Sequence, residues 1–234
     1  FIVDNVMEAE YLNEAVQRYD HELHVLIRVN PGVEAHTHEY IVTAHDDSKF
    51  GISIHEQDVL AEMIGMLQQN PNIVFDGFHA HIGSQIFEPQ AFETEIEVMG
   101  RFLYEMQETY GIESRCLDVG GGFAVRYTDE DRPIPIDLEC QTILKPCEKQ
   151  KEKYQLPLAK ILIEPGRSIV GEAGLTLYTV GFQKKTLHRR YVFVDGGMSD
   201  NIRPALYQAK YRCDIANRME EDKTEAVCIA GKCC

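Results

Sequence analysis

The stretch IVFDGFHAHIGS (residues 73–84) has the pattern that decides the fold, because an apolar β-type run leads directly into histidine, glycine and serine. In the stretch that follows, apolar residues recur every three or four positions: Phe92, Ile96, Met99, Leu103, Met106 and Tyr110. This spacing matches the 3.6-residue period of an amphipathic helix. A strand followed by a long helix is the repeating unit of a parallel sheet with helical crossovers.

The same alternation extends in both directions along the chain. Strands are expected at residues 1–3, 23–29, 73–79, 116–119 and 160–164. Helices are expected between them at residues 6–18, 55–69, 92–110 and 138–154, and one face of the second carries Val59, Leu60, Met63, Ile64 and Leu67. The sheet could be an open doubly wound sheet or a barrel. A barrel needs about eight strands, so on that reading we expect three more to precede Phe1.

The pattern changes after Arg167. Residues 172–182, 191–195 and 224–229 are typical of strands, and no long helices separate them. We therefore place a domain boundary near residue 170, with the start of a β-rich domain over residues 171–234. On the barrel interpretation, residues 1–170 form an incomplete (β/α)8 barrel.

Composition argues against nucleic-acid binding, membrane insertion and secretion. The chain has 234 residues and a net charge of −15 with dispersed acids, which disfavours a nucleic-acid partner because such binding needs clustered Lys and Arg. No apolar run reaches the 18 residues that suggest a membrane span, and no secretory signal is visible. Seven cysteines without zinc-finger spacing favour reduced thiols, so we expect a cytoplasmic protein.

Polar and glycine residues follow three successive strands. They are His79 to Ser84, then Gly120 to Gly122, then Glu164 to Arg167. The carboxyl ends of parallel strands meet on one face, where barrel enzymes build their sites. We therefore expect the three groups to surround a common cavity.

The glycine triplet allows two interpretations. It could be a tight turn between a strand and a helix, or a cup whose backbone N–H groups approach a phosphate closely. A dinucleotide-binding fingerprint needs the spacing GxGxxG, but Gly122 is followed by Phe123 to Arg126. The phosphate cup is the better functional interpretation.

Glu164 and Arg167 could form a surface ion pair at the start of a helix. Because Glu164 ends an apolar strand, we instead expect its carboxylate to point into the barrel mouth. A buried carboxylate there needs a cationic partner, for which a protonated pyridine nitrogen would serve. Arg167 could bind a phosphate or carboxylate through two N–H groups.

His79 and His81 lie on the same face of a strand and could begin a metal site. Such sites draw further histidines from later strands, but only His188 follows, so we expect no metal. In the alternative that we favour, His81 stacks on a planar cofactor, Ser84 donates to its phosphate, and His79 is a satisfied core histidine. His36 and His38 lie in a polar loop and are expected to be solvated.

These motifs together resemble the fold-type III pyridoxal-phosphate-dependent decarboxylases. The matching pieces are Arg28, HAHIGSQ (79–85), LDVGGGF (117–123) and EPGRSIV (164–170). The resemblance implies that His81 stacks on the pyridine ring of pyridoxal 5'-phosphate and that Glu164 keeps the ring nitrogen protonated. It further implies that Arg28 lies near the phenolic oxygen of the ring. The phosphate would be bound by Ser84, Gly120, Gly121, Gly122, Pro165, Gly166 and Arg167.

The segment VDGGMSDNIRPALY (194–207) is most similar to the branch of this family that decarboxylates meso-2,6-diaminopimelate to L-lysine. Arg203 and Tyr207, with Arg167, would bind the distal end of this amino-acid substrate, where a carboxylate needs a fixed guanidinium. The resemblance also implies a homodimer with shared active sites, to which Cys234 contributes the catalytic thiol. Adjacent Cys233 is the alternative for that thiol.

No lysine of this chain matches the one that bonds the cofactor in the family, so we expect this chain alone to be inactive. Alternatives are a decarboxylase of arginine, ornithine or carboxynorspermidine, a non-catalytic paralogue that dimerises with a partner, and, less well supported, a metal hydrolase. Arg203 would suit the cationic substrates poorly, and a paralogue would tend to have lost site residues.

Overall fold

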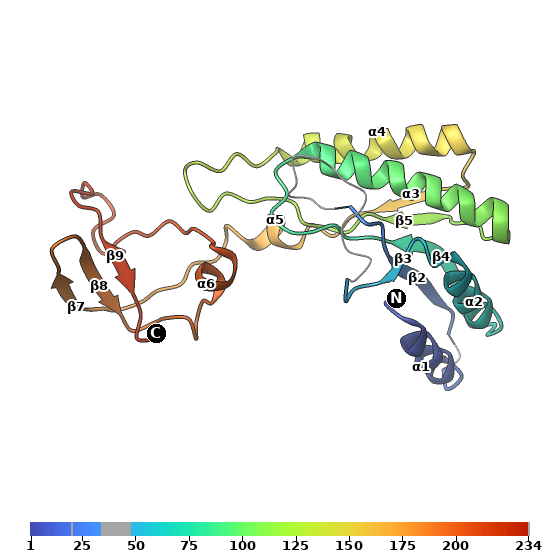
Figure 1. Cartoon of the computed structure of the whole chain (residues 1–234), viewed down its shortest axis with the longest axis horizontal. Coiled ribbons are helices and arrows are strands. Elements are labelled where there is room, and N and C mark those ends of the chain that lie inside the picture. The colour runs from blue at the N-terminus through green and yellow to red at the C-terminus, as the bar shows by residue number, and fades with distance from the viewer. Residues whose placement is uncertain (20, 34–47, 234) are drawn as a thin grey trace. The chain divides into compact units, whose positions relative to one another are not determined.

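The computed structural model describes residues 1–19, 21–33 and 48–233. Two units are distinguished by their internal contacts (Figure 1). The first unit comprises residues 1–125 and 133–169, and the second comprises residues 126–132 and 170–234.

The first unit is built on a parallel sheet. Its strands lie in the order β1 (Ile2–Val3), β2 (Leu23–Asn30), β4 (Ile73–His79), β5 (Cys116–Asp118) and β6 (Lys160–Leu162). Each strand lies beside its predecessor, whereas the strand order of a doubly wound sheet reverses at a switch point. The expected α/β fold is confirmed, with the strand order of a barrel. The short strand β3 (Ile52–Ser53), parallel to β2, was not expected.

Helices connect these strands. They are α1 (Val6–Val16), α2 (Gln57–Gln68), α3 (Pro89–Tyr110), α4 (Ile136–Tyr154) and the short α5 (Gly166–Val170). The side chain of Asn5 caps α1 by accepting from the backbone N–H of Glu8 at 2.9 Å. Gly111 ends α3 with φ +66°, a left-handed conformation that suits glycine. No helix among the described residues is long and apolar enough to cross a membrane.

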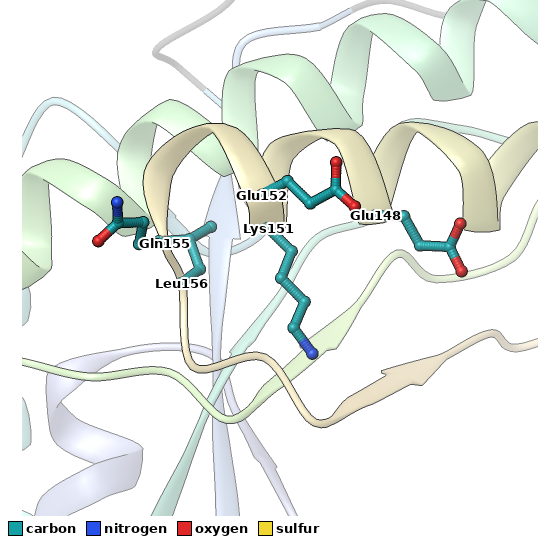
Figure 2. A pocket seen from close by; sticks show the side chains of 5 residues that line it. All are labelled: Glu148, Lys151, Glu152, Gln155 and Leu156. Atoms are coloured by element: carbon teal, nitrogen blue, oxygen red, sulfur yellow. The ribbon is translucent and has the colours of Figure 1, made fainter.

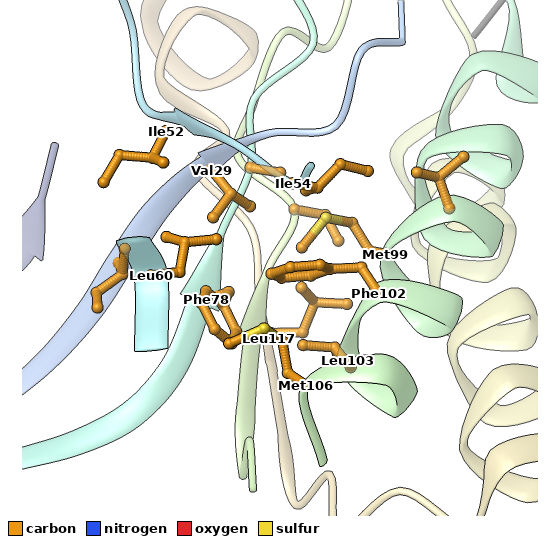
Figure 3. Packing of buried hydrophobic residues seen from close by; sticks show 14 of the residues in the cluster. Val29, Ile52, Ile54, Leu60, Phe78, Met99, Phe102, Leu103, Met106 and Leu117 are labelled. Atoms are coloured by element: carbon orange, nitrogen blue, oxygen red, sulfur yellow. The ribbon is translucent and has the colours of Figure 1, made fainter. Parts of the chain in front are cut away.

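The core lies where α3 meets the sheet (Figure 3). Phe102 on α3 packs edge to face against Phe78 on β4, with ring centroids 4.9 Å apart. Met99 and Met106 on the same helix face are fully buried, as the helical period requires. On α2 the expected apolar face is correct except at Val59, which is 37% exposed and lies outside the buried stripe.

The second unit contains a three-stranded sheet. Strand β7 (Val180–Lys185) pairs antiparallel with β8 (Arg190–Val194), and β9 (Cys228–Ala230) pairs parallel with β8. The strand expected over residues 172–182 is wrong for its first eight residues, because residues 172–179 form a turn and an irregular segment. The short helix α6 (Arg203–Tyr207) occupies the RPALY segment.

Candidate functional site

Three strand ends meet in the first unit, and backbone hydrogen bonds fix their relative positions. The N–H of Ala80 after β4 donates to the carbonyl of Asp118 at the end of β5, at 2.8 Å. The N–H of Glu164 after β6 donates to the carbonyl of Gly120 at 2.7 Å. The histidine, glycine and glutamate motifs are therefore adjacent, as barrel topology predicts.

A pocket of about 170 Å³ lies at this junction. It draws residues from all three motifs, so the structure brings together the groups that the sequence analysis expected around one cavity. Gly120 and Arg28 were expected there but are not among the lining residues. The pocket is lined by His81, Ser84, Gly121, Gly122, Phe123, Glu164, Pro165, Gly166, Arg167 and Ser168.

The glycine triplet lies too close to neighbouring backbone for any side chain. A Cβ atom on Gly121 would lie 2.1 Å from the carbonyl oxygen of Glu164, and one on Gly122 would lie 2.3 Å from that of Gly83. Gly120 and Gly122 also have φ values of +67° and +98°, which favour glycine. The triplet thus closes one wall of the pocket through backbone contact, and the turn and phosphate-cup interpretations are compatible.

His81 is half-buried at the pocket and contacts the glycine loop. The N–H of Gly121 donates to Nδ1 of His81 at 3.1 Å, so a neutral ring carries its proton on Nε2. Burial lowers the pKa of His81, and the charges of Arg28 and His79 lower it further, whereas the charge of Glu164 raises it. The net effect favours the neutral ring, and the hydrogen bond from Gly121 orients it.

Glu164 differs from expectation, because its side chain is 45% exposed rather than buried. Its Oε2 lies 3.4 Å from Nε2 of His79, which is itself only 3% exposed. His79 is not the satisfied core histidine that we expected, because its Nδ1 has no hydrogen-bond partner among the described residues. The carboxylate can face the pocket because the backbone after β6 carries it out of the core.

Arg167 presents a guanidinium to the pocket. Its Nη1 is buried and has no hydrogen-bond partner among the described residues. A buried donor without an acceptor is costly in a folded protein. The geometry of this side chain therefore suits an anion in the pocket.

Arg28 lies on β2, in register with His79 on β4. Its guanidinium lies 3.8 Å from a carboxylate oxygen of Asp4 and 4.5 Å from the centroid of the Phe50 ring. It is close enough to His81 to affect the charge of that ring, although it does not line the pocket.

Arg203 and Tyr207 belong to the second unit, where they contact each other. The guanidinium of Arg203 lies 5.5 Å from the centroid of the Tyr207 ring, and its Nε donates to the hydroxyl of Tyr211 at 2.9 Å. Cys234 lies outside the described residues, as do His36 and His38. Cys233 is exposed, with its sulfur 4.0 Å from Oγ of Ser199.

Sequence reasoning missed Asp118 as a site residue, although it stands in the LDVGGGF segment. It is 4% exposed and accepts a hydrogen bond from the N–H of Gly120 at 2.9 Å. Asp118, His79 and Glu164 each have one nitrogen or oxygen atom in a cluster, with these atoms all within 4.8 Å of one another. An acid at the end of a buried strand, two residues before the first of three glycines, was the available signal. His81 is not in this group, so the cluster does not match the HxH metal site that was weighed as an alternative.

A larger hollow of about 480 Å³ lies at the C-terminal end of α4 (Figure 2). Its lining comes from that one helix end and the residues after it, and consists mostly of long charged or polar side chains. It brings no groups together from separate strands, and we assign it no chemistry. The lining residues are Glu148, Lys151, Glu152, Gln155 and Leu156.

The chain is similar to a known protein family and to curated members of that family. Residues 1–171 match the family described as "Pyridoxal-dependent decarboxylase, pyridoxal binding domain". A curated diaminopimelate decarboxylase of Bacillus subtilis (strain 168) is 45% identical over 234 residues, which is 100% of this chain and 53% of that protein. The chain therefore spans about half the length of the curated relatives that it matches.

The solved structures that are similar to this chain include diaminopimelate decarboxylases. The crystal structure of diaminopimelate decarboxylase from M. jannaschii has a TM-score of 0.81 and 31% identity, covering 99% of this chain and 52% of that one. The enzyme from Helicobacter pylori in complex with L-lysine has a TM-score of 0.77 and 30% identity, covering 100% of this chain and 55% of that one.

Proposed function

Because this chain belongs to the pyridoxal-dependent decarboxylases, we propose that it forms part of an enzyme that converts meso-2,6-diaminopimelate to L-lysine and CO2 with pyridoxal 5'-phosphate. The observation that carries the proposal is the pocket at which His81, the glycine loop, Glu164 and Arg167 meet. The similarity to curated diaminopimelate decarboxylases extends over the whole chain and supports this substrate.

The residues of the pocket fit the cofactor. The buried, unpartnered Nη1 of Arg167 offers a donor to a phosphate, and the hydroxyl of Ser84 lies on the same pocket. Glycines at 121 and 122 let a ligand approach the backbone, since no side chain projects from them. The volume of about 170 Å³ is below the roughly 300 Å³ of a typical small-molecule site, so these residues form one wall of the complete site.

The bound cofactor supplies an electron sink for the electron pair left when CO2 departs. Glu164 would hold the proton on the ring nitrogen and so favour this chemistry. His81, whose pKa burial lowers, would stack on the cofactor ring. Ser84, Pro165, Gly166 and Arg167 on the pocket, with the Gly120–Gly122 loop, would bind the phosphate, and Arg28, behind the lining residues, would act toward the phenolic oxygen.

Arg203 and Tyr207 bind the far end of the substrate, with Arg167 contributing. The contact between the Arg203 guanidinium and the Tyr207 ring limits the conformations of that arginine and prepares it for a carboxylate. The substrates of arginine and ornithine decarboxylases carry a cation there instead, which Arg203 would repel. This charge difference distinguishes the proposed substrate from its nearest alternatives.

The complete site needs groups beyond those described. No lysine lines the pocket among the described residues, so we propose that the lysine that bonds the cofactor is not one of residues 1–234. The chain alone would then be inactive. The active enzyme is proposed to be a homodimer in which Cys234, or its neighbour Cys233, donates a proton at the site of the partner subunit.

An assay of the complete gene product tests the function. We expect stoichiometric binding of pyridoxal 5'-phosphate, with release of CO2 and formation of L-lysine from meso-diaminopimelate. Ornithine and arginine, tested at the same concentrations, should react at least tenfold more slowly. Bound cofactor with equal turnover of ornithine would contradict the substrate assignment, and absence of cofactor binding would contradict the function as a whole.

A further inference from the structure

Two buried groups behind Glu164 have no role in the proposed function. His79 ends β4 and Asp118 ends β5, and the two residues are directly paired in the register of these parallel strands. Glu164 joins them because its N–H is bound to the carbonyl of Gly120, two residues after Asp118. Backbone pairing alone therefore brings the three side chains together.

The exposure of the three side chains differs sharply. His79 and Asp118 are 3% and 4% exposed, whereas the side chain of Glu164 is 45% exposed. Glu164 is thus the member that lines the pocket, and the other two lie behind it. A carboxylate and an imidazole are buried at this depth only at a cost, unless their charges and protons are matched.

We propose that His79 and Asp118 are positioning residues for Glu164, in that Nε2–H of His79 donates to one carboxylate oxygen of Glu164 while the buried carboxylate of Asp118 lies beside the same ring and favours this donor role. The inference rests on the proposed role of Glu164 toward the cofactor ring. Oε2 of Glu164 is then fixed by His79, and its other oxygen remains free to face the ring nitrogen. The observed 3.4 Å between Nε2 and Oε2 is long, as such contacts often are before a ligand binds.

Electrostatic evidence supports the coupling of these groups. Burial raises the pKa of Asp118, the hydrogen bond from Gly120 lowers it, and the charge of His79 lowers it as well, whereas Glu164 raises it. The two carboxylates thus repel each other, and the imidazole lies close to both, with one ring nitrogen within 4.8 Å of an oxygen of each.

Other ionisable groups around the site do not take this role. Arg28 pairs with His79 across β2 and β4, but its guanidinium lies against Asp4 and Phe50. His81 is turned to the glycine loop. Burial, and then the charge of Asp118, raises the pKa of Glu95 on α3, but the two carboxylate oxygens of Glu95 have no hydrogen-bond partner among the described residues.

The first test observes the histidine itself in the complete gene product without cofactor. Long-range ¹H–¹⁵N spectra report which ring nitrogen carries the proton, and His79→Gln identifies the signal by its disappearance. We expect the His79 ring to carry its proton on Nε2. In Asp118→Asn, we expect a smaller fraction of rings with the proton on Nε2. A ring with bare Nε2 and its proton on Nδ1 alone would overturn the proposal, whether or not the protein binds pyridoxal 5'-phosphate.

The second test observes the ring nitrogen of ¹⁵N-labelled pyridoxal 5'-phosphate bound to the same protein. His79→Gln places an amide N–H where Nε2–H stood, so we expect the signal of a protonated ring nitrogen. His79→Leu removes the donor, so the protonated fraction should fall and turnover should decrease about 10- to 100-fold, the usual cost of a charge-assisted hydrogen bond. Phosphate contacts should keep the cofactor bound in both variants.

Ser114→Ala is the matched control, because Ser114 is also buried, at 4% exposure, and its hydroxyl is unpartnered among the described residues. Its cofactor signal should equal that of the wild type. A wild-type signal in His79→Leu would refute the positioning role while leaving the proposed function intact. Wild-type protein that binds no cofactor would refute the function instead. If His79→Leu does not fold, the spectra of His79→Gln and Asp118→Asn still decide the outcome.

Discussion

Replacing Gly121 by alanine should damage both stability and activity. The added Cβ would lie 2.1 Å from the carbonyl oxygen of Glu164 and 3.1 Å from its carbonyl carbon. The obstacle is backbone, which the hydrogen bond between Glu164 and Gly120 holds in place. No side-chain rotation can relieve the clash, so the strand ends must separate.

The size of the expected destabilisation follows from the rigidity of the Glu164 backbone. Overpacking in a protein interior costs about 1–3 kcal/mol, and a backbone clash belongs at the upper end, near 3 kcal/mol. The free energy of unfolding should fall by that amount. Displacement of Glu164 by about 1 Å should also reduce turnover by about 100-fold, because catalytic groups tolerate little misplacement.

Gly65→Ala is the control for this experiment. Gly65 lies in α2, and a Cβ there would meet nothing within 4 Å. The same chemical change should therefore stabilise the protein, by about 0.8–1 kcal/mol from helix propensity. Urea unfolding and decarboxylation by the complete gene product measure both effects. Equal stabilities for Gly121→Ala and Gly65→Ala would refute the reasoning.

Four further predictions follow from the structure. Phe102→Ala should lower the free energy of unfolding by about 3–5 kcal/mol, measured by urea titration, because this ring is 2% exposed in the core between α3 and the sheet. Burial, and then the charge of Asp118, raises the pKa of Glu95 well above its ordinary 4.5, so the wild type should lose stability as pH rises above about 4.5 toward the raised pKa. Glu95→Gln should remove this loss, and its thermal midpoint should exceed that of the wild type at pH 8 but match it near pH 4. Glu164→Gln should lower turnover without abolishing cofactor binding, and unchanged turnover would exclude the role proposed for this carboxylate. Arg203→Ala should reduce kcat/KM for meso-diaminopimelate by about 10- to 100-fold with unchanged cofactor affinity, and an effect on cofactor affinity alone would contradict substrate binding.

The alternating strands and helices could be predicted because burial imposes a period on the sequence. Strand β4 (Ile73–His79) has the predicted bounds, and α3 (Pro89–Tyr110) contains the whole apolar stripe that the spacing indicated. Strand β3 was missed because its two residues are too few to show a periodic hydrophobic pattern. The strand over residues 172–182 was predicted too long, since β-type residues there are exposed and their composition alone does not require pairing.

The sequence alone determined which chemical groups follow each strand, because barrel strands place polar and glycine residues at their carboxyl ends. His81, Gly121, Gly122, Glu164 and Arg167 were all predicted to share a cavity, and they line one pocket. Their roles toward cofactor and substrate stay predictions.

Only the tertiary structure decided how these groups are buried and paired. His79 and Glu164 are 85 residues apart in sequence, and no local pattern shows that their side chains meet at 3.4 Å. Burial of Asp118 and exposure of Glu164 likewise depend on the register between β4, β5 and the segment after β6. Strand register and backbone direction are long-range properties, and they determine which of two neighbouring carboxylates reaches the pocket and which remains behind it.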